Sequence, residues 1–431
     1  MISSWGNIST IKNTEEKNIL WRDENDFFQK QPVLAYGNGR SYGDVCLNNN
    51  GVIIKTHQLN RFIYFDSQTG ILVCESGCLL SDILSFAIFK GWTLPVVPGT
   101  QYVTVGGAIA NDVHGKNHHM RGTFGCHVNR FALLRSTGEL WECAPHQNAE
   151  LFRATVGGIG LTGIILWAEI QLMPIKSDYL TVTTEPFYGI EKFIALSKDA
   201  EKTHEYTVAW LDCQSDRKNF ARGLFSKANY HQEKLITKND ARKKLSVPIN
   251  LPSMVLNRWT IRAFNQLYFY AGARNQSEKL VRANSFFFPL DAIHHWNRIY
   301  GSRGFYQYQC VVPMQNGDTV ITNLLNTIVK SRQGSFLSVL KILGDKPSPG
   351  ILSFPMPGIT LALDFPNKGS ETLALLNKLD DIVMNENGRV YLAKDTRLSK
   401  KQFAHYYGKA WENFSAYHDP GFSSSLIRRV M

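Results

Sequence analysis

The amino-acid sequence predicts an α+β protein built from two domains. At 431 residues, the chain exceeds the size at which a single hydrophobic core keeps growing, so two domains are expected. Glycine is dense up to about residue 175 and sparse from there to about residue 301, which places a domain boundary near residue 177. Beyond this point strand-like and helical segments alternate in a pattern typical of an antiparallel sheet covered by helices.

Before the boundary, short strands alternate with turn signals. The runs with strand-like composition are 32–35, 52–55, 62–65, 71–74, 94–97 and 164–172. Leu80, Ile83, Leu84 and Ala87 share one face at helical spacing, which predicts a helix over 79–89. A second, shorter helix is expected over 150–154.

After the boundary, the predicted strands are 206–211, 305–312, 338–342 and 358–365, and the predicted helices are 190–197, 290–300, 320–331 and 371–385. Strand alternation places Gln307 and Gln309 on one face, and Lys341 on the same face as Val339. A sheet face with two amides and an ammonium is either solvated or the floor of a polar binding site. A last strand is expected over 388–397, and this tail is expected to return to the first domain.

Two glycine-rich stretches carry the clearest functional signal. Residues 36–44 read YGNGRSYGD, residues 98–107 read PGTQYVTVGG, and each stretch follows a predicted strand. Glycines after strands let backbone N–H groups approach a ligand, and consecutive N–H groups in such turns bind anions such as a pyrophosphate. The second stretch enters a small-residue segment, 105–110, whose start would add a helix N-terminus to the same anion site. Ordinary glycine turns are the alternative, but two such loops in one half of the chain favour a cofactor.

Several common site types are excluded or disfavoured. Neither loop has the Gly-x-Gly-x-x-Gly spacing of a Rossmann turn, and the chain has no P-loop. Its seven cysteines are scattered without a Cys-x-x-Cys pair, which argues against a disulfide framework or zinc ribbon and fits a reducing compartment. His114, His118 and His119 lie within six residues, but no cysteine or carboxylate joins them at ligand spacing, so no metal is expected. The first residues lack the features of a signal peptide, and no apolar run approaches the ~20 residues of a spanning helix.

The formal net charge of +11 calls for an anionic partner or surface. Much of the positive charge lies in 216–222 and 234–244, which are expected to form a mobile loop. No nucleic-acid-binding motif accompanies this charge, so nucleic acid is not the expected partner. An anionic lipid surface or a phosphorylated substrate accounts for it at least as well.

A basic amphipathic helix is predicted over 256–270. Its apolar positions are Leu256, Trp259, Ala263, Leu267 and Tyr270, while Arg258, Arg262 and Gln266 lie to one side. Such a helix either lies in a membrane interface or packs on the core with a solvated face, and both alternatives stay open at this point.

The sequence resembles the flavin oxidoreductases of the vanillyl-alcohol-oxidase superfamily. The stretches that carry the resemblance are 36–44, 98–100, 105–108, 114–119, 154–163 and 391–395, so it covers nearly the whole chain. The 114–119 stretch, HGKNHH, and the 391–395 stretch, YLAKD, are the most specific. Within the superfamily the chain is most similar to the members that oxidise a polyprenyl-phosphate ribose.

The resemblance implies a bipartite FAD-binding domain of the PCMH type. Residues 1–177 and the returning segment 389–431 would form that domain, and an antiparallel-sheet substrate (cap) domain, 178–388, would cover the flavin ring. The implied cofactor-binding residues are Gly37, Asn38, Gly39, Arg40, Ser41, Tyr42, Pro98, Gly99, Thr100, Thr104, Gly106, Gly107, Asn111, His114, Gly115, Asn117, Gly163, Ile164, Tyr391 and Lys394. Arg40 stands where many members carry the histidine that bonds covalently to the flavin, so non-covalent FAD is expected, with Arg40 available to pair with phosphate oxygens.

The implied chemistry is oxidation of an alcohol by hydride transfer to the flavin. The implied catalytic residues are Lys394, Tyr42, His114 and Lys341, and the implied substrate-binding residues are Lys116, Trp210, Gln307, Gln309, Val339, Lys341, Thr360 and Ala362. Lys394 would stabilise the reduced flavin or help to deprotonate the hydroxyl, and Lys341 would face a phosphate or a hydroxyl. On the residues alone, an exposed strand lysine and an ordinary core tryptophan remain the alternatives.

Two positions depart from the family pattern. Thr360 and Ala362 stand where the family pocket commonly carries an asparagine and a cysteine. Hydride transfer does not require the cysteine, but loss of an amide that bonds a sugar hydroxyl leaves the identity of the sugar open.

The expected function is therefore oxidation of the 2′-hydroxyl of a polyprenyl-phosphate pentose to a keto sugar. This step would be the first half of an epimerisation to the arabinose form for cell-envelope polysaccharide, completed by a partner reductase, in the cytoplasm or at the periphery of the bacterial inner membrane. A soluble FAD-dependent sugar-alcohol or sugar-lactone oxidase and a flavin-free binding protein on the same scaffold are the alternatives.

Overall fold

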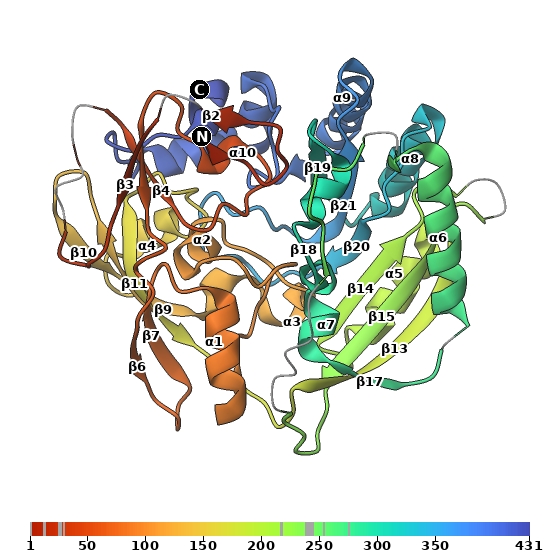
Figure 1. The fold of residues 1–431 in the computed structure, drawn as a ribbon, viewed down its shortest axis with the longest axis horizontal. Coiled ribbons are helices and arrows are strands. Elements are labelled where there is room, and N and C mark those ends of the chain that lie inside the picture. Colours follow the sequence, from red (N-terminus) through yellow and green to blue (C-terminus); the bar gives the residue numbers. More distant parts are fainter. Residues whose placement is uncertain are drawn as a thin grey trace.

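A computed structural model describes the chain except residues 1, 12–13, 25–27, 29–30, 216–218, 238–244, 253–254 and 275. Two lobes lie side by side (Figure 1). The N-terminal lobe is drawn in red to yellow, with blue C-terminal helices over it, and the second lobe runs from green to blue. Most of the two basic segments predicted as a mobile loop, 216–222 and 234–244, lies outside the described residues.

The N-terminal lobe contains two main sheets. A parallel sheet has the order β3 (Glu15–Asn18), β5 (Val52–Lys55), β4 (Val33–Tyr36), and an antiparallel sheet has the order β10 (Leu140–Cys143), β9 (Val128–Leu134), β11 (Ile164–Gln171), β7 (Ile71–Glu75), β6 (Phe62–Phe65). Short pairs are formed by β1 (Ile2–Ser3) with β2 (Thr10–Ile11) and by β8 (Trp92–Thr93) with β12 (Met173–Pro174). The helices are α1 (Leu80–Ala87), α2 (Val105–Ala110), α3 (His118–Arg121) and α4 (Ala149–Thr155). The predicted helix over 79–89 is confirmed as α1, which buries all four of its predicted apolar positions.

The second lobe is a large antiparallel sheet. In the described residues its order is β17 (Lys279–Arg282), β13 (Tyr179–Tyr188), β15 (Arg222–Tyr230), β14 (Tyr206–Leu211), β20 (Ser338–Leu343), β21 (Gly358–Pro366), β19 (Phe305–Pro313), β22 (Arg389–Val390). Its other elements are α5 (Ile190–Ala200), α6 (Arg258–Ala273), α7 (Ala283–Phe287), α8 (Gly317–Ser331), α9 (Ser370–Asn385) and the pair β16 (Leu245–Ser246) and β18 (Ile293–His294). These antiparallel sheets with attached helices confirm the predicted α+β class.

The two faces of this large sheet have different roles. On one face, inward side chains of the central strands pack in a single core with α5, α8 and α9, for example Phe225 and Leu340 with Phe193 and Leu324. The residues that alternate with these core positions point to the opposite face, toward the N-terminal lobe. The fold thereby leaves one sheet face available to form a site between the lobes.

Some predicted elements are wrong. The segment predicted as one helix over 290–300 is two 3₁₀ helices, Pro289–Ala292 and Trp296–Tyr300, separated by β18, because His295 adopts a left-handed backbone with φ +55°. The strand predicted over 388–397 ends at Val390. The run 94–97 is no strand, since only β8 precedes the second glycine loop.

Arg222 also corrects the prediction of a mobile basic loop over 216–222. It begins β15 and is buried, with its guanidinium 2.9 Å from the carboxylate of Asp212. Neither β13 nor β15 was predicted from the sequence, because threonine and charged residues interrupt their apolar alternation.

The predicted helix over 256–270 is confirmed as α6, but its buried face is not the expected one. Asn257 caps its N-terminus, and Ile261, Asn265 and Phe269 face the protein. Within the predicted apolar stripe, Trp259 and Leu267 point outward and are 72% and 73% exposed. The helix therefore packs on the lobe with a solvated face, as one alternative held, but through other side chains, and contact of the outward residues with a membrane stays a prediction.

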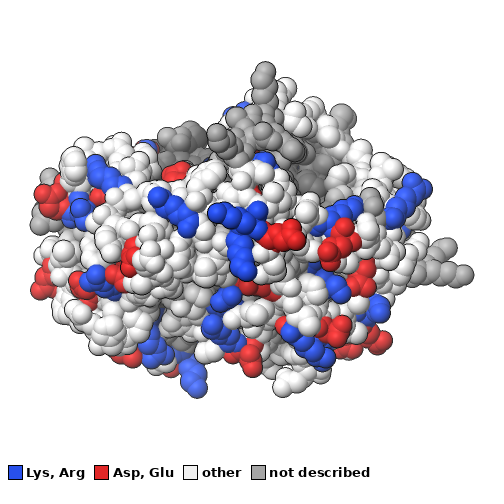
Figure 2. Space-filling view, turned by 90° about the horizontal axis from the view of Figure 1, so that it is seen from below, with Lys and Arg blue, Asp and Glu red and all other residues white. Residues whose placement is uncertain are grey.

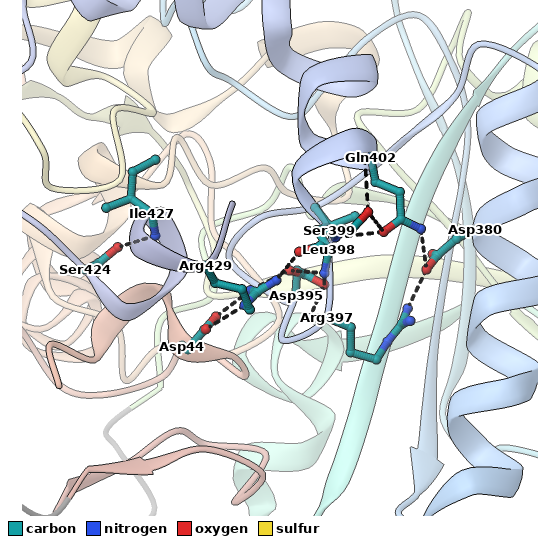
Figure 3. A network of polar contacts seen from close by, with 10 residues as sticks. All are labelled: Asp44, Asp380, Asp395, Arg397, Leu398, Ser399, Gln402, Ser424, Ile427 and Arg429. Carbon is teal, nitrogen blue, oxygen red and sulfur yellow. Dashed lines mark hydrogen bonds and ion pairs between the residues drawn. The ribbon is translucent and has the colours of Figure 1, made fainter. Parts of the chain in front are cut away.

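The last two helices of the chain are α10 (Lys400–Ser415) and α11 (Ser425–Val430). Figure 3 shows Arg429 of α11 between two carboxylates from distant parts of the chain. Its guanidinium lies 2.8 Å from Asp44, which follows the first glycine loop, and 2.9 Å from Asp395. Asp395 also accepts hydrogen bonds from the backbone N–H of Arg397 and Leu398. Arg429 therefore fixes the first glycine loop against the segment that carries Lys394.

We expect Arg429→Met to lower the free energy of unfolding by roughly 3 kcal/mol, because it leaves two buried carboxylates without their cation. Chemical denaturation measures this change. The matched control is Arg153→Met, since Arg153 pairs only with the exposed Glu150 at the surface and should change stability by less than about 0.5 kcal/mol. Equal effects of the two substitutions would contradict the assigned role of Arg429.

Candidate active site

A cavity of about 970 Å³ lies between the two lobes. The two glycine loops line it on one side, and the free face of the large sheet lines it on the other. Of the residues predicted to form the site, all but two line this cavity. The exceptions are Asn117, which is buried and donates to the carbonyl of Pro95, and Ile164, which lies in the core beneath the N-terminal sheets.

The two glycine loops are joined to each other. The Asn38 side chain donates to the carbonyl of Tyr102 over 2.8 Å. Thr104 caps α2, since its hydroxyl accepts a hydrogen bond from the N–H of Gly107 at 3.2 Å. A Cβ at Gly37 would collide with that hydroxyl. The first loop is therefore held directly against the helix N-terminus, as the sequence predicted for a shared anion site.

Gly99 differs from the other loop glycines. A Cβ added at Gly99 would meet no protein atom within 4 Å, whereas Gly39 has a left-handed backbone with φ +58°. The chain can therefore fold with a larger residue at 99 but not easily at 39. The empty space beside the Gly99 backbone in the cavity wall would let a ligand lie directly against that backbone.

The cavity wall also carries polar atoms without partners among the described residues. The hydroxyl of Ser76 and the amide oxygen of Asn111 are buried there and accept or donate no hydrogen bond. Both oxygens expose almost no surface to the cavity, so the fit to a ligand rests on the other observations. Arg40 contributes positive charge nearby, with its guanidinium 4.4 Å from the ring centre of Trp5. An open glycine cradle and a cation fit a dinucleotide cofactor such as FAD.

His114 is the centre of a hydrogen-bonded floor on the sheet side. Its Nε2 lies 3.1 Å from Nε2 of Gln309, and its Nδ1 lies 3.3 Å from Nζ of Lys341. Burial and the charge of Lys341 hold the pKa of His114 well below its usual value, so the imidazole is neutral. A neutral imidazole offers one acceptor and one N–H. The pair of contacts is satisfied when Gln309 donates to Nε2 and the Nδ1–H donates to a neutral Lys341 amine.

Burial lowers the pKa of Lys341 to about 7, helped by the charges of Lys116 and Lys394. Its Nζ also donates to the carbonyl of Gly115 at 3.0 Å. Gln309 donates in addition to the hydroxyl of Thr360 at 3.3 Å. Of the two alternatives left by the sequence, the polar face is thus the floor of a cavity and not a solvated surface.

Lys394 lines the same cavity as this floor. Its Nζ is 3.9 Å from the ring centre of Tyr42. Burial lowers the pKa of Lys394 to about 7, while the carboxyl of Asp364 acts in the opposite direction. Asp364 also accepts a hydrogen bond of 2.7 Å from the side chain of Gln307, which lies opposite it on the neighbouring strand. Near neutral pH, a small change in the surroundings therefore decides whether Lys394 carries a proton.

A third amine, Lys116, lies at the cap-side edge of the site. Its Nζ donates to the carbonyl of Phe287 at 2.8 Å, and burial lowers its pKa to about 8. Trp210 lies at the same edge with its indole N–H bonded to the carbonyl of Phe336 at 3.0 Å. Lys116, Lys341 and Lys394 thus place three amines with lowered pKa values in one cavity. Such a site favours an anionic ligand, because the negative charge would raise the pKa values of all three amines.

Sequence reasoning missed many cavity residues. On the FAD-binding side they include Trp5, Ser76, Tyr102 and Asp291, and on the sheet they include Val182, Thr184, Val208, Leu224 and Ser226. The sheet residues share a face with Val339 and Lys341, but finding them requires the strand order, which the sequence does not supply. In the described parts of the chain, no group of three histidine, cysteine or acidic side chains is placed to hold a metal ion.

Comparisons with known proteins agree with this geometry. Residues 12–144 match the model of a family described as an FAD binding domain. Decaprenylphosphoryl-β-D-ribose oxidase of Mycolicibacterium smegmatis is 34% identical over 449 residues, covering all of this chain and 97% of that protein. An uncharacterised protein of Streptomyces coelicolor is 30% identical over 79% of this chain and 96% of its own length. L-Gulonolactone oxidase of Bos taurus is 28% identical over 42% of this chain and 41% of its own length.

The similarity to the mycobacterial oxidase covers the whole chain. The predicted cofactor, FAD, and the predicted class of activity are thereby confirmed. The chain belongs to the decaprenylphosphoryl-β-D-ribose oxidase family of FAD-dependent oxidoreductases.

Proposed function

We propose that the protein oxidises the 2′-hydroxyl of a polyprenyl-phosphate pentose, such as decaprenylphosphoryl-β-D-ribose, to the keto sugar. One observation carries this proposal: Lys394 and the hydrogen-bonded His114–Gln309–Lys341 floor line one cavity together with the two glycine loops. A hydroxyl held on this floor has a proton acceptor close by. The three amines fit a substrate that carries a phosphate.

We propose that FAD binds without a covalent bond. Its diphosphate would be held by the backbone of 37–42 and 99–107, by the N-terminus of α2 and by Arg40. When bound, the flavin supplies the acceptor for the hydride that leaves the sugar carbon.

Side chains of the protein would orient the substrate, accept its proton and stabilise the developing charge. Gln309 would orient the substrate hydroxyl, and Lys341, in its neutral form, would accept the proton in place of the Nδ1–H of neutral His114, which positions the amine until then. Lys394, beside Tyr42, would stabilise the negative charge that develops in the reaction. The phenol of Tyr42 stays protonated, because burial raises its pKa well above the usual value.

Thr360 and Ala362 bear on the identity of the sugar. Both line the cavity, and the Thr360 hydroxyl is already engaged, since it donates to the carbonyl of Cys310 at 2.8 Å and accepts from Gln309. It has little capacity left to replace the amide that the family pattern carries there. We therefore propose that this enzyme accepts a pentose whose recognition rests mainly on Gln307, Gln309 and Lys341.

The proposed product is a reactive keto sugar, so we propose a reductase partner that completes epimerisation to the arabinose form for cell-envelope polysaccharide. No helix of the described chain has both the length and the apolar character to cross a membrane. We propose that the protein works in the cytoplasm, in contact with the inner membrane that holds its lipid-linked substrate. On the face shown in Figure 2, lysine and arginine side chains are interspersed with acidic ones rather than gathered in one basic patch.

The second candidate is a soluble FAD-dependent sugar-alcohol or sugar-lactone oxidase. It is favoured by the two changed pocket positions and by the partial similarity to L-gulonolactone oxidase. Anaerobic reduction of the bound flavin should be compared for polyprenyl-phosphate ribose, free pentoses, alditols and lactones. We expect reduction by the lipid-linked pentose alone, whereas equal rates with a free alditol or lactone would establish the second candidate.

A further inference from the structure

We propose that the cavity has a second arm, along the large sheet beneath α6, that binds the isoprenoid chain of the substrate next to its phosphate. This inference rests on the proposed function and adds the binding site for the lipid. The tail arm is lined by Val182, Thr184, Val208, Leu224 and Ser226 of the sheet and by Ala271 and Gly272 of α6.

The strand register connects this arm to the catalytic floor in a straight row. Gln309 lies opposite Ala362, which lies opposite Val339 on the next strand. Val339 lies opposite Trp210, and Trp210 lies opposite Leu224. Residues directly opposite each other in antiparallel strands point to the same face. With strands about 4.8 Å apart, the four steps from Gln309 to Leu224 span about 19 Å.

Polarity falls along this row. It starts at the Gln309 amide and passes through the small or apolar side chains of Ala362 and Val339 to the ring of Trp210. The indole N–H of Trp210 is already used by the carbonyl of Phe336, so the ring offers the cavity an apolar surface. Leu224 ends the row. A ligand that fits must therefore be polar at one end and apolar over the rest.

The two hydroxyl groups within the arm are hydrogen-bonded to each other. Thr184 and Ser226 lie opposite one another, and their hydroxyl oxygens are 2.8 Å apart in a hydrogen bond. Val208 lies opposite Ser226 on the other side. This bond leaves only one of the two O–H groups of the arm without a partner among the described residues, so burial of hydrocarbon is the main favourable contribution available there.

The helix that covers the arm carries an exposed apolar surface on its outer side. A Cβ at Gly272 would collide with Leu224, so glycine lets α6 approach the sheet closely at this point. The same helix turns Trp259, Leu267 and Tyr270 outward. Exposed apolar surface of this kind is typical of contact with a partner or a lipid surface. An isoprenoid chain too long for the arm would leave it beside this helix, toward a membrane.

The test measures binding of sugar-free isoprenoid phosphates to the FAD-loaded protein, so that it does not depend on turnover. Isopentenyl phosphate, geranyl phosphate and farnesyl phosphate are compared by calorimetry, with inorganic phosphate as the reference. We expect farnesyl phosphate to bind at least tenfold more tightly than isopentenyl phosphate, because its additional apolar surface is buried in the arm. Equal affinities for the five-carbon and fifteen-carbon compounds would overturn the proposal.

Variants locate the binding. Ser226→Phe fills the arm and should reduce the gain from chain length to less than threefold, and Val208→Phe fills the same space from the next strand if the first variant does not fold. The matched control is Lys227→Phe, one residue along β15 and on the opposite face, which should keep the gain. An undiminished gain in both filled variants, with their flavin content intact, would place the chain elsewhere and overturn the proposal.

The outcomes separate this inference from the proposed function. If affinity rises with isoprenoid length as expected but no polyprenyl-phosphate pentose is oxidised, the tail arm is supported and the proposed reaction is contradicted. If the pentose is oxidised with the same kcat/KM at every chain length, the reaction is supported and the tail arm is contradicted.

Discussion

Replacing Lys394 by methionine is expected to lower the rate constant for flavin reduction by about 10²-fold or more while FAD remains bound. Methionine keeps the length and apolar contacts of the side chain but removes the amine that lies 3.9 Å from the ring centre of Tyr42. Loss of a positioned acid, base or charge next to the reacting groups costs rates of this order. Anaerobic stopped-flow spectroscopy of the purified holoprotein measures the reduction directly.

The pH dependence of the same rate constant separates the two roles considered for Lys394. Its pKa is lowered to about 7 by burial. If the ammonium form stabilises negative charge, reduction slows as pH rises through the pKa. If the neutral amine accepts the proton, reduction speeds up over that range. Because neutral Lys341, with a pKa that is also about 7, accepts the proton, our assignment predicts a bell-shaped profile: reduction speeds up as Lys341 loses its proton and slows as Lys394 loses its own. Lys394→Met should lack the falling limb.

Lys90→Met is the matched control for this substitution. Lys90 also lies over an aromatic ring, 4.9 Å from that of Phe86, but it does not line the cavity. Its replacement should leave flavin reduction unchanged. A Lys394→Met protein that reduces its flavin as fast as the Lys90→Met protein would remove Lys394 from the mechanism.

Replacing Gly99 by leucine is expected to abolish FAD binding at micromolar cofactor without unfolding the chain. No protein atom lies within 4 Å of a Cβ at this position, so the larger side chain would extend into the space assigned to the cofactor. The stability of the FAD-free protein should change by less than about 0.5 kcal/mol, whereas the stabilisation that added FAD gives the wild-type protein should disappear. Flavin absorbance after gel filtration and thermal unfolding with and without FAD measure both effects.

The control for this second substitution is Gly408→Leu. Gly408 lies in α10, and a Cβ there also meets no atom within 4 Å. It does not line the cavity. The Gly408→Leu protein should retain full flavin content, and a Gly99→Leu protein that also did so would show that the cofactor does not pass this point.

Much of the site could be predicted from the sequence because its chemistry is carried by short contiguous motifs. The first glycine loop and the segment 98–107 are local in sequence, so their conformations follow from glycine, a preceding strand and the threonine cap of α2. Alternation within one strand was enough to place Gln307 and Gln309 together and to pair Lys341 with Val339.

The tail arm could not be predicted in this way. It combines β14 and β15, which are consecutive, with β13, which pairs with β15 rather than with the next strand along the chain, and it joins the floor only through the pairing of β14 with the distant β20. Polar residues such as Thr184 and Ser226 weaken the apolar alternation of the outer strands, although their hydroxyls are hydrogen-bonded to each other in the folded sheet.

The orientation of α6 was missed for a related reason. Its more apolar stripe contains Trp259 and Leu267, which periodicity assigns to the core. The fold instead buries Ile261, Asn265 and Phe269, and Asn265 donates to the buried carboxylate of Asp212 at 2.9 Å. A buried polar network across three elements thus decides which face of the helix is inside, and a hydrophobicity pattern along one helix contains no information about it.

The central claim is that a hydride passes from the sugar carbon of a lipid-linked pentose to FAD bound in the cavity between the lobes. The most direct measurement is a single-turnover reaction without oxygen between the holoprotein and farnesylphosphoryl ribose, with hydrogen or deuterium at C2′. We expect the flavin absorbance to bleach and deuterium at C2′ to slow the bleaching. A flavin that stays oxidised in the presence of this compound, but is reduced by a free alditol or lactone, would contradict it.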